Sequence, residues 1–238
     1  MEEYITFYDL KDNIILNTFK DFHLLIQSLI IPTAEIKEEV EVIPGTSNII
    51  DYTEALTGNV NYNQRIIPIE LAGIKNKSEF LSTYSKFQNK LHGQKVKMIL
   101  SEEPNFYWIG RVSVGDINPY GILRNIDLEI KVDPYKYEIN SSADDWLWDP
   151  FSFEDGIINE TNNLKVDGEL TVNIYGRRKT VVPKITCDTP MKVIFNSNEY
   201  NLSALTQKVL DIQICEGQNT LKFIGNGTVT IDYRGGSL

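Results

Sequence analysis

The chain has 238 residues, of which 42% are hydrophobic and 24% are charged, as in a folded globular protein of one large or two ordinary domains. Two cysteines, 15 glycines and 9 prolines exclude a disulfide scaffold and a collagen-like repeat. The 33 acidic and 23 basic side chains give a net charge of −10, which argues against a protein that grips nucleic acid through its phosphates.

The beginning of the chain and its most apolar stretch argue against export and membrane insertion. Residues 22–32 form that stretch, which contains polar side chains and is shorter than the roughly 20 apolar residues that a bilayer span requires. The first residues are acidic, whereas a secretory signal begins with a basic region. We therefore expect no membrane association and no secretory signal.

Alternation of apolar and polar residues dominates the first half of the chain and predicts strands with one buried face. Residues 125–132 are the clearest case, and residues 67–71 follow the same rule. A Pro-Gly turn signal at 118–121 predicts a hairpin between strands at 111–115 and 122–132.

Residues 78–92 break this alternation and predict one amphipathic helix. Apolar side chains recur there at steps of four, three and four residues, which places them on one helical face. We expect Ser78 to cap the helix start and Gly93 to adopt the left-handed conformation after its end. The face should cover a sheet through Phe80, Tyr84, Phe87 and Leu91.

A stretch of small polar residues at 140–145 marks a domain boundary. We predict a β domain at 1–138 that contains the helix, a linker at 139–149 and an all-β sandwich at 150–238. In the sandwich we expect strands that include residues 210–214, 221–223 and 229–233, and a hairpin turn at 225–227.

The sequence offers no recognisable catalytic, metal or cofactor site. The two histidines, His23 in a strand-like run and His92 at the helix end, lack a neighbouring nucleophile motif, so we expect core or capping roles. Cys187 and Cys215 are interpreted as buried thiols, with a disulfide or metal pair as the alternative. A carboxylate pair for glycoside hydrolysis remains a further alternative, since 33 acidic residues permit many pairs.

An aromatic cluster at 146–153 allows two interpretations. Trp146 and Trp148 could stack on sugar rings, as exposed aromatics do in many small β-sandwiches. Alternatively, the cluster pins the linker onto the core of the second domain, which is the interpretation we prefer.

The order of short motifs over most of 1–138 resembles the distal tail proteins of long-tailed bacteriophages. A Pro-Gly pair precedes an acidic turn, a tyrosine precedes a strand that begins with arginine, a glycine lies in the strand at 107–112, and Asp-Pro-Tyr-Lys closes the domain. The ending at 229–238 resembles the galectin-like or carbohydrate-module-like sandwich of the same family. The residues that carry the first-domain resemblance are Pro44, Gly45, Asp51, Tyr62, Arg65, Gly110, Asp133, Pro134 and Tyr135.

The resemblance implies a structural, non-enzymatic protein at the tip of a virion tail, made in the cytoplasm of the bacterial host. It implies a ring of six identical subunits between the tail tube protein and a lysin-like tail-tip hub. DNA would leave through the channel, and an acidic lumen would let it pass without specific binding. A free-standing carbohydrate-binding protein is the alternative.

Overall fold

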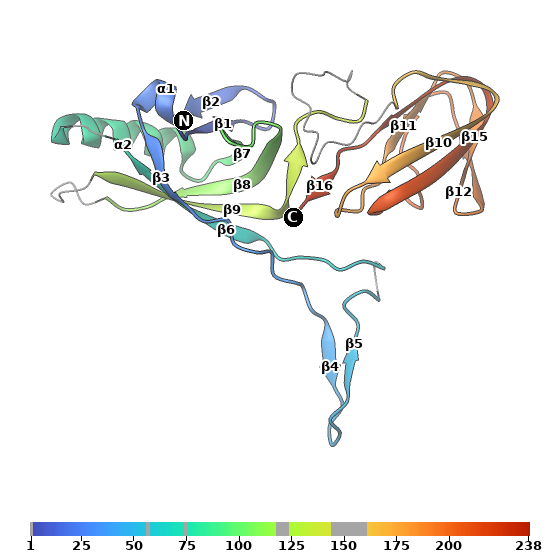
Figure 1. Cartoon of the computed structure of the whole chain (residues 1–238), viewed down its shortest axis with the longest axis horizontal. Coiled ribbons are helices and arrows are strands. Elements are labelled where there is room, and N and C mark those ends of the chain that lie inside the picture. Colours follow the sequence, from blue (N-terminus) through green and yellow to red (C-terminus); the bar gives the residue numbers. More distant parts are fainter. Residues whose placement is uncertain (1, 56–57, 74–75, 118–123, 144–160) are drawn as a thin grey trace. The chain divides into compact units, whose positions relative to one another are not determined.

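The computed structural model describes residues 2–55, 58–73, 76–117, 124–143 and 161–238 (Figure 1). The fold is mainly β, as the alternation predicts. The chain divides into two compact units, Met1–Lys136 with Leu238 and Tyr137–Ser237. The predicted turn at 118–121 and most of the predicted linker at 139–149 lie outside the described residues, so those boundaries stay predictions.

The first unit is built on one sheet, whose strands follow the order β2-β1-β7-β8-β9-β6-β3. Ile67 on β6 lies opposite Ile130 on β9 in an antiparallel pair, and both side chains are fully buried. The alternation predicted for both strands is therefore confirmed. The strands are β1 (Ile5–Tyr8), β2 (Ile14–Asn17), β3 (Leu25–Leu29), β6 (Arg65–Ala72), β7 (Lys95–Leu100), β8 (Phe106–Val114) and β9 (Asn125–Glu138).

Helix α2 (Lys77–Leu91) confirms the predicted amphipathic helix and covers one face of this sheet (Figure 1). Phe80, Phe87 and Leu91 are buried in the core, and Tyr84 packs against it while its hydroxyl donates to the Gly115 carbonyl. The start differs from the prediction, because Asn76 rather than Ser78 accepts the capping bond, from the Glu79 N–H at 3.0 Å. Gly93 has a φ of +76°, as predicted.

A second, short helix, α1 (Thr18–Phe22), replaces the strand-like conformation expected around His23. Asn17 caps its start by accepting from the backbone of Phe19 and Lys20. His23 ends it in the left-handed region, with a φ of 54°. The expectation of a single helix was therefore wrong, because a local asparagine cap forms one turn inside an apolar run.

An arm, which we define as residues 33–64, leaves the sheet between β3 and β6 and extends away from it (Figure 1). It carries a two-stranded ribbon of β4 (Val40–Val42) and β5 (Ile49–Asp51). Backbone bonds between Glu35 and Asn63, and between Lys37 and Asn61, continue the pairing toward the sheet.

The second unit is centred on one long strand, β15 (Gly217–Asp232), which pairs with β10 along most of its length. Strand β12 also pairs with its middle and β11 with its end. Besides β15, the strands of this unit are β10 (Leu164–Gly176), β11 (Lys184–Cys187), β12 (Met191–Phe195), β13 (Asn198–Leu202), β14 (Thr206–Gln207) and β16 (Gly236–Ser237).

Two local predictions in this unit were wrong. Residues 225–227 form no turn, because β15 continues through them, and Gly225 and Gly227 have φ values of 151° and 143°. Residues 210–214 form no strand, because the Ile212 N–H bonds to the Val209 carbonyl in a tight turn. Only Ile214 makes a β-bridge, to Val181.

Candidate functional site at the base of the arm

The residues that carry the family resemblance fall into two groups in the structure. The first group lies where the arm joins the sheet, on β6, β8, β9 and the segment just before β6. The second group lies near the tip of the arm. The first group is Tyr62, Arg65, Gly110, Asp133, Pro134 and Tyr135, and the second is Pro44, Gly45 and Asp51.

Arg65 connects the two ends of the arm to the end of β9. Its side chain is buried, and Nη1 donates to the Pro32 carbonyl at 3.0 Å while Nη2 donates to the Pro134 carbonyl. The guanidinium carbon lies 4.6 Å from the centre of the Trp108 ring. Burial lowers the pKa of Arg65 below its usual value, but an arginine stays charged at any physiological pH. A planar group with several donors is suited to holding two carbonyls at once.

The two signature tyrosines meet at the same place. Tyr62 and Tyr135 form an edge-to-face pair with ring centres 6.0 Å apart. Tyr62 also makes a β-bridge to Ile36 on the other strand of the arm. Ring contacts of this kind add stabilisation beyond area burial, so the base of the arm is fixed from both strands.

Gly110 permits the close approach of β8 and β9. A Cβ atom at this position would lie 2.6 Å from the Lys131 carbonyl oxygen and 2.7 Å from the Val132 side chain. Only glycine fits such a distance to backbone, so the requirement here is steric rather than conformational.

The second group shapes the arm itself. Gly45 lies in the turn between β4 and β5 with a φ of +81°, which glycine adopts without strain. The Asp51 carboxylate accepts from the Thr53 N–H at 2.9 Å, and hydrogen bonds from Thr53 lower the pKa of Asp51. Both residues therefore support the local structure of the arm.

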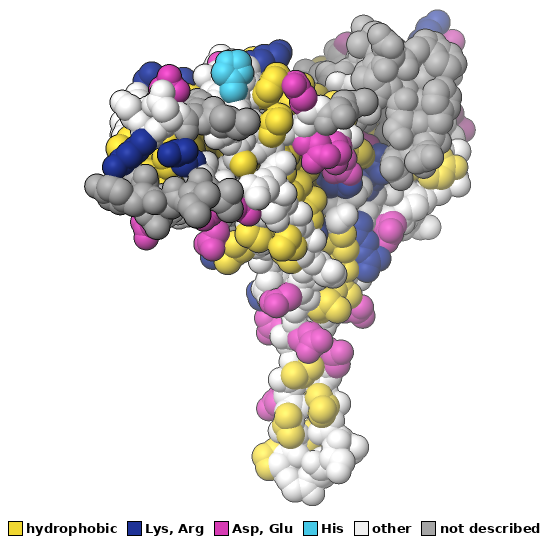
Figure 2. Space-filling view, turned by 60° about the vertical axis from the view of Figure 1, so that its left-hand side comes forward, with side chains coloured by type: hydrophobic (Ala, Val, Ile, Leu, Met, Phe, Trp, Pro, Cys, Tyr) yellow, Lys and Arg dark blue, Asp and Glu magenta, His cyan; other side chains and the backbone are white. Residues whose placement is uncertain are grey.

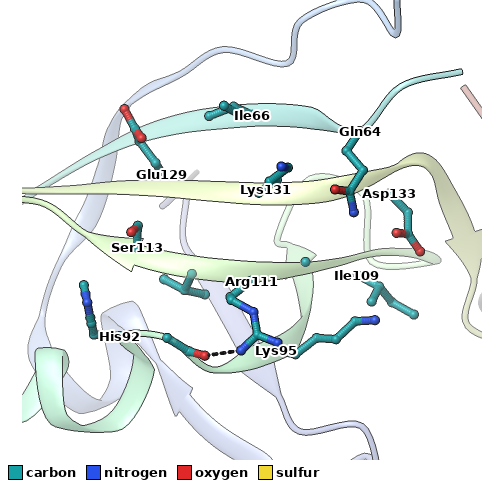
Figure 3. A pocket seen from close by; sticks show the side chains of 13 residues that line it. Gln64, Ile66, His92, Lys95, Ile109, Arg111, Ser113, Glu129, Lys131 and Asp133 are labelled. Carbon is teal, nitrogen blue, oxygen red and sulfur yellow. Dashed lines mark hydrogen bonds between the residues drawn. The ribbon is translucent and has the colours of Figure 1, made fainter. Parts of the chain in front are cut away.

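A shallow groove of about 560 Å³ runs over the sheet face opposite α2, beside the base of the arm (Figure 3). It is formed by outward-facing side chains of β6, β7, β8 and β9. Its ionisable lining residues are His92, Lys95, Arg111, Glu129, Lys131 and Asp133. Ile66 and Ile109 add apolar side chains to the lining of the groove.

Basic groups predominate in this groove. Arg111 donates to the Gly93 carbonyl at 2.5 Å (Figure 3), whereas within the described part of the chain neither Lys95 nor Lys131 forms an ion pair. All three side chains are exposed, so their charges face solvent.

The histidines and cysteines of the described residues have structural surroundings. Both histidines cap helices, and His92 Nδ1 accepts from the Val114 N–H at 3.1 Å. No group of three or more candidate metal ligands occurs among the described residues, and no helix there is long and apolar enough to cross a bilayer. Cys187 is buried and Cys215 half-buried, and the two form no disulfide. Trp146 and Trp148 lie outside the described residues.

Comparison with solved structures identifies the fold, whereas sequence comparison finds no matching family model and no curated relative. The crystal structure of the Dit protein (gp 19.1) of phage SPP1, described as a paradigm of the hub adsorption apparatus in phages that infect Gram-positive bacteria, matches over 97% of this chain and 98% of its own. The identity is 13% and the TM-score 0.56. The activated baseplate of phage p2 with Sr matches over 98% and 97%, at 11% identity and a TM-score of 0.45.

The chain therefore has the fold of a phage distal tail protein over nearly its whole length. The resemblance that the motif order predicts is confirmed at the level of the fold. The roles of the individual signature residues in assembly stay predictions.

Proposed function

We propose that this protein is a structural hub at the distal end of a phage or phage-like tail. Its subunits form a six-membered ring that joins the tail tube to the tail tip, and DNA leaves through the channel of the ring. The observation that carries the proposal is the fold match to a phage hub protein, which covers 97% of this chain and 98% of that protein.

The surface chemistry of the first unit supports an assembling protein. Aliphatic side chains of the arm are strongly exposed, among them Val40 at 52%, Val42 at 63% and Ile49 at 62%. A two-stranded ribbon with exposed apolar residues is only marginally stable in water. Contact with another subunit would bury these groups.

The role in the tail is non-catalytic. In support of this, the buried guanidinium of Arg65 at the candidate site is held by two backbone carbonyls and the Trp108 ring, which is a structural role. The partners on the two faces of the ring would be the tail tube protein and a tail-tip hub protein.

Light scattering coupled to size-exclusion chromatography tests the ring. We expect a mass of six subunits, alone or after addition of the neighbouring tail tube protein. A particle of one subunit at every concentration, with and without that protein, would contradict the proposal.

A further inference from the structure

We propose that the acidic, apolar arm of one subunit docks into the basic groove of the next copy of the chain. The proposal rests on the ring described above and names the contact that closes it. It assigns a partner to two surfaces that the described part of one chain leaves uncovered, the arm ribbon and the sheet face opposite α2.

The arm has a strong excess of acidic side chains. Residues 33–64 contain six carboxylates and one lysine, all of them exposed. Figure 2 shows acidic side chains along the middle of the arm and hydrophobic ones toward its tip. The carboxylates are those of Glu35, Glu38, Glu39, Glu41, Asp51 and Glu54, and the lysine is Lys37.

One face of the ribbon is mainly apolar. Val42 lies directly opposite Ile49, and Val40 lies two residues before Val42 on the same strand, so the three side chains share a face with Asp51. Each of the three aliphatic side chains is more than half exposed. The ribbon therefore offers an aliphatic strip that shares its face with Asp51, while Glu41 and Ile50 lie on the other face.

The groove has the complementary character. Lys95, Arg111 and Lys131 supply positive charge, and they outnumber the carboxylates of Glu129 and Asp133. Apolar surface comes from Ile66, which is 51% exposed and lies opposite Lys131 on the neighbouring strand, and from Ile109, two residues before Arg111 on β8. An acidic arm with an aliphatic strip therefore meets a groove that presents both basic and apolar side chains, so the two surfaces match in charge and in apolar character.

The charges also decide how two copies meet. Arm against arm would oppose carboxylates to carboxylates, and groove against groove would oppose ammonium groups, so both symmetric pairings are repulsive. Arm into groove joins two different surfaces of the same chain. Such a head-to-tail contact generates a closed ring when its rotation is a fraction of a full turn.

The arm is poorly placed to fill the groove of its own subunit. Paired strands run from Glu35 and Asn63 to Val42 and Ile49, and at about 3.3 Å per residue the ribbon reaches roughly 20 Å beyond its base. Its base is fixed by the bonds of Arg65. Folding back would break this pairing, whereas a neighbouring copy can present its groove at the required distance.

Charge reversal on each surface, followed by mixing, tests the contact. The arm variant carries E38K, E39K and E41K, and the groove variant carries K95E, R111E and K131E. Each variant alone opposes like charges at every contact, so we expect at least a tenfold higher concentration for half-assembly. Mixed in equal amounts, the two variants oppose unlike charges at every contact in an alternating ring. We therefore expect the mixture to regain most of the assembly of the unmodified protein.

A control variant separates the contact from net charge. K86E, K165E and K208E change three exposed lysines outside the groove by the same total charge as the groove variant. We expect this variant to assemble like the unmodified protein. Circular dichroism should show that all variants are folded, because every substituted side chain is exposed.

Several results would overturn the proposal. Unchanged assembly of the arm and groove variants would leave the ring intact but place its contact elsewhere. Loss of assembly without recovery on mixing would show that the two surfaces do not meet. Protection of residues 38–54 from hydrogen exchange in a one-subunit particle would show the arm on its own chain. Loss of binding to a double-stranded DNA probe by the groove variant, with assembly unchanged, would assign the groove to phosphates. A one-subunit particle in every condition would instead remove the ring itself, and the docking contact with it.

Discussion

The guanidinium of Arg65 lies over the indole of Trp108, with 4.6 Å between the guanidinium carbon and the ring centre. The same guanidinium donates to the carbonyls of Pro32 and Pro134, which are 102 residues apart in sequence. One buried side chain thus joins the start of the arm, a core tryptophan and the end of β9. This relationship gives the arm a fixed base, as the proposed contact with a second subunit requires.

Replacing Arg65 should loosen this junction. We expect R65A to lower the free energy of unfolding by about 3 kcal/mol, because two carbonyls lose a charged donor. R65K should lose less, since it keeps the charge but lacks the fork of donors. Urea unfolding followed by tryptophan fluorescence measures the change. K86A, at an exposed site on α2, is the control, and equal stability of R65A and K86A would contradict this role.

Gly110 should tolerate no side chain, in contrast to Gly45. G110A would place a methyl group 2.6 Å from the Lys131 carbonyl oxygen, so we expect a loss of about 1–3 kcal/mol in unfolding free energy. G45A meets nothing within 4 Å and strains only the arm turn, through its φ of +81°. Hydrogen exchange should report G45A in the arm alone and G110A across the sheet. A global effect from G45A would contradict the separation of arm and core.

Removing the ribbon should leave the first unit folded. Replacing residues 38–54 by a short Gly-Ser linker deletes β4 and β5, which contribute no residue to the buried core cluster. We therefore expect the unfolding free energy to change by no more than about 0.5 kcal/mol. The same variant should fail to form the ring. A large loss of stability would mean that the ribbon packs on the core.

The two cysteines should differ in reactivity. Burial raises the pKa of the Cys187 thiol to about 11, so almost none of it is thiolate at pH 8. Cys215 is half-buried, and we expect one thiol per folded chain to react rapidly with an aromatic disulfide reagent. C215S should abolish that rapid reaction. Rapid labelling of C215S would contradict the assignment.

The same pKa shift predicts a dependence of stability on pH. The thiol of Cys187 binds its proton more tightly in the folded chain than at the reference value of 9.0. Its contribution to stability is therefore fully present below pH 9 and is lost as the pH rises toward 11. Urea unfolding across this range should show a smaller decline for C187A than for the unmodified protein. Equal declines would contradict the prediction.

Sequence reasoning predicted the elements with strong periodicity and missed those set by local polar contacts. The stripe of α2 and the alternation of β6 and β9 are visible because burial on one face imposes a period. Helix α1 was missed because it is five residues long and depends on the cap by Asn17. Ile212 and Ile214 are buried although they lie outside any strand. The alternation of the sequence therefore predicted their burial correctly but not their backbone hydrogen bonds.

The candidate site was predictable only in part. The order of the motifs identified Arg65, Pro134 and the tyrosine pair as candidate residues. Their contacts with one another join residues far apart in sequence, and no local pattern predicts such contacts. The acidic residues from Glu35 to Glu41 are flanked in sequence by Ile36, Val40 and Val42, a pattern that is typical of a strand with one solvated face. No signal indicated that these aliphatic neighbours are exposed as well, because alternation specifies two faces and not what covers them. The basic groove was missed because its lysines come from different strands.

Negative-stain electron microscopy of the purified protein, alone and with the tail tube protein, is the decisive measurement. The proposed function predicts annular particles whose class averages have sixfold symmetry and a central channel. Fields of small separate particles with no annuli in either sample would contradict it.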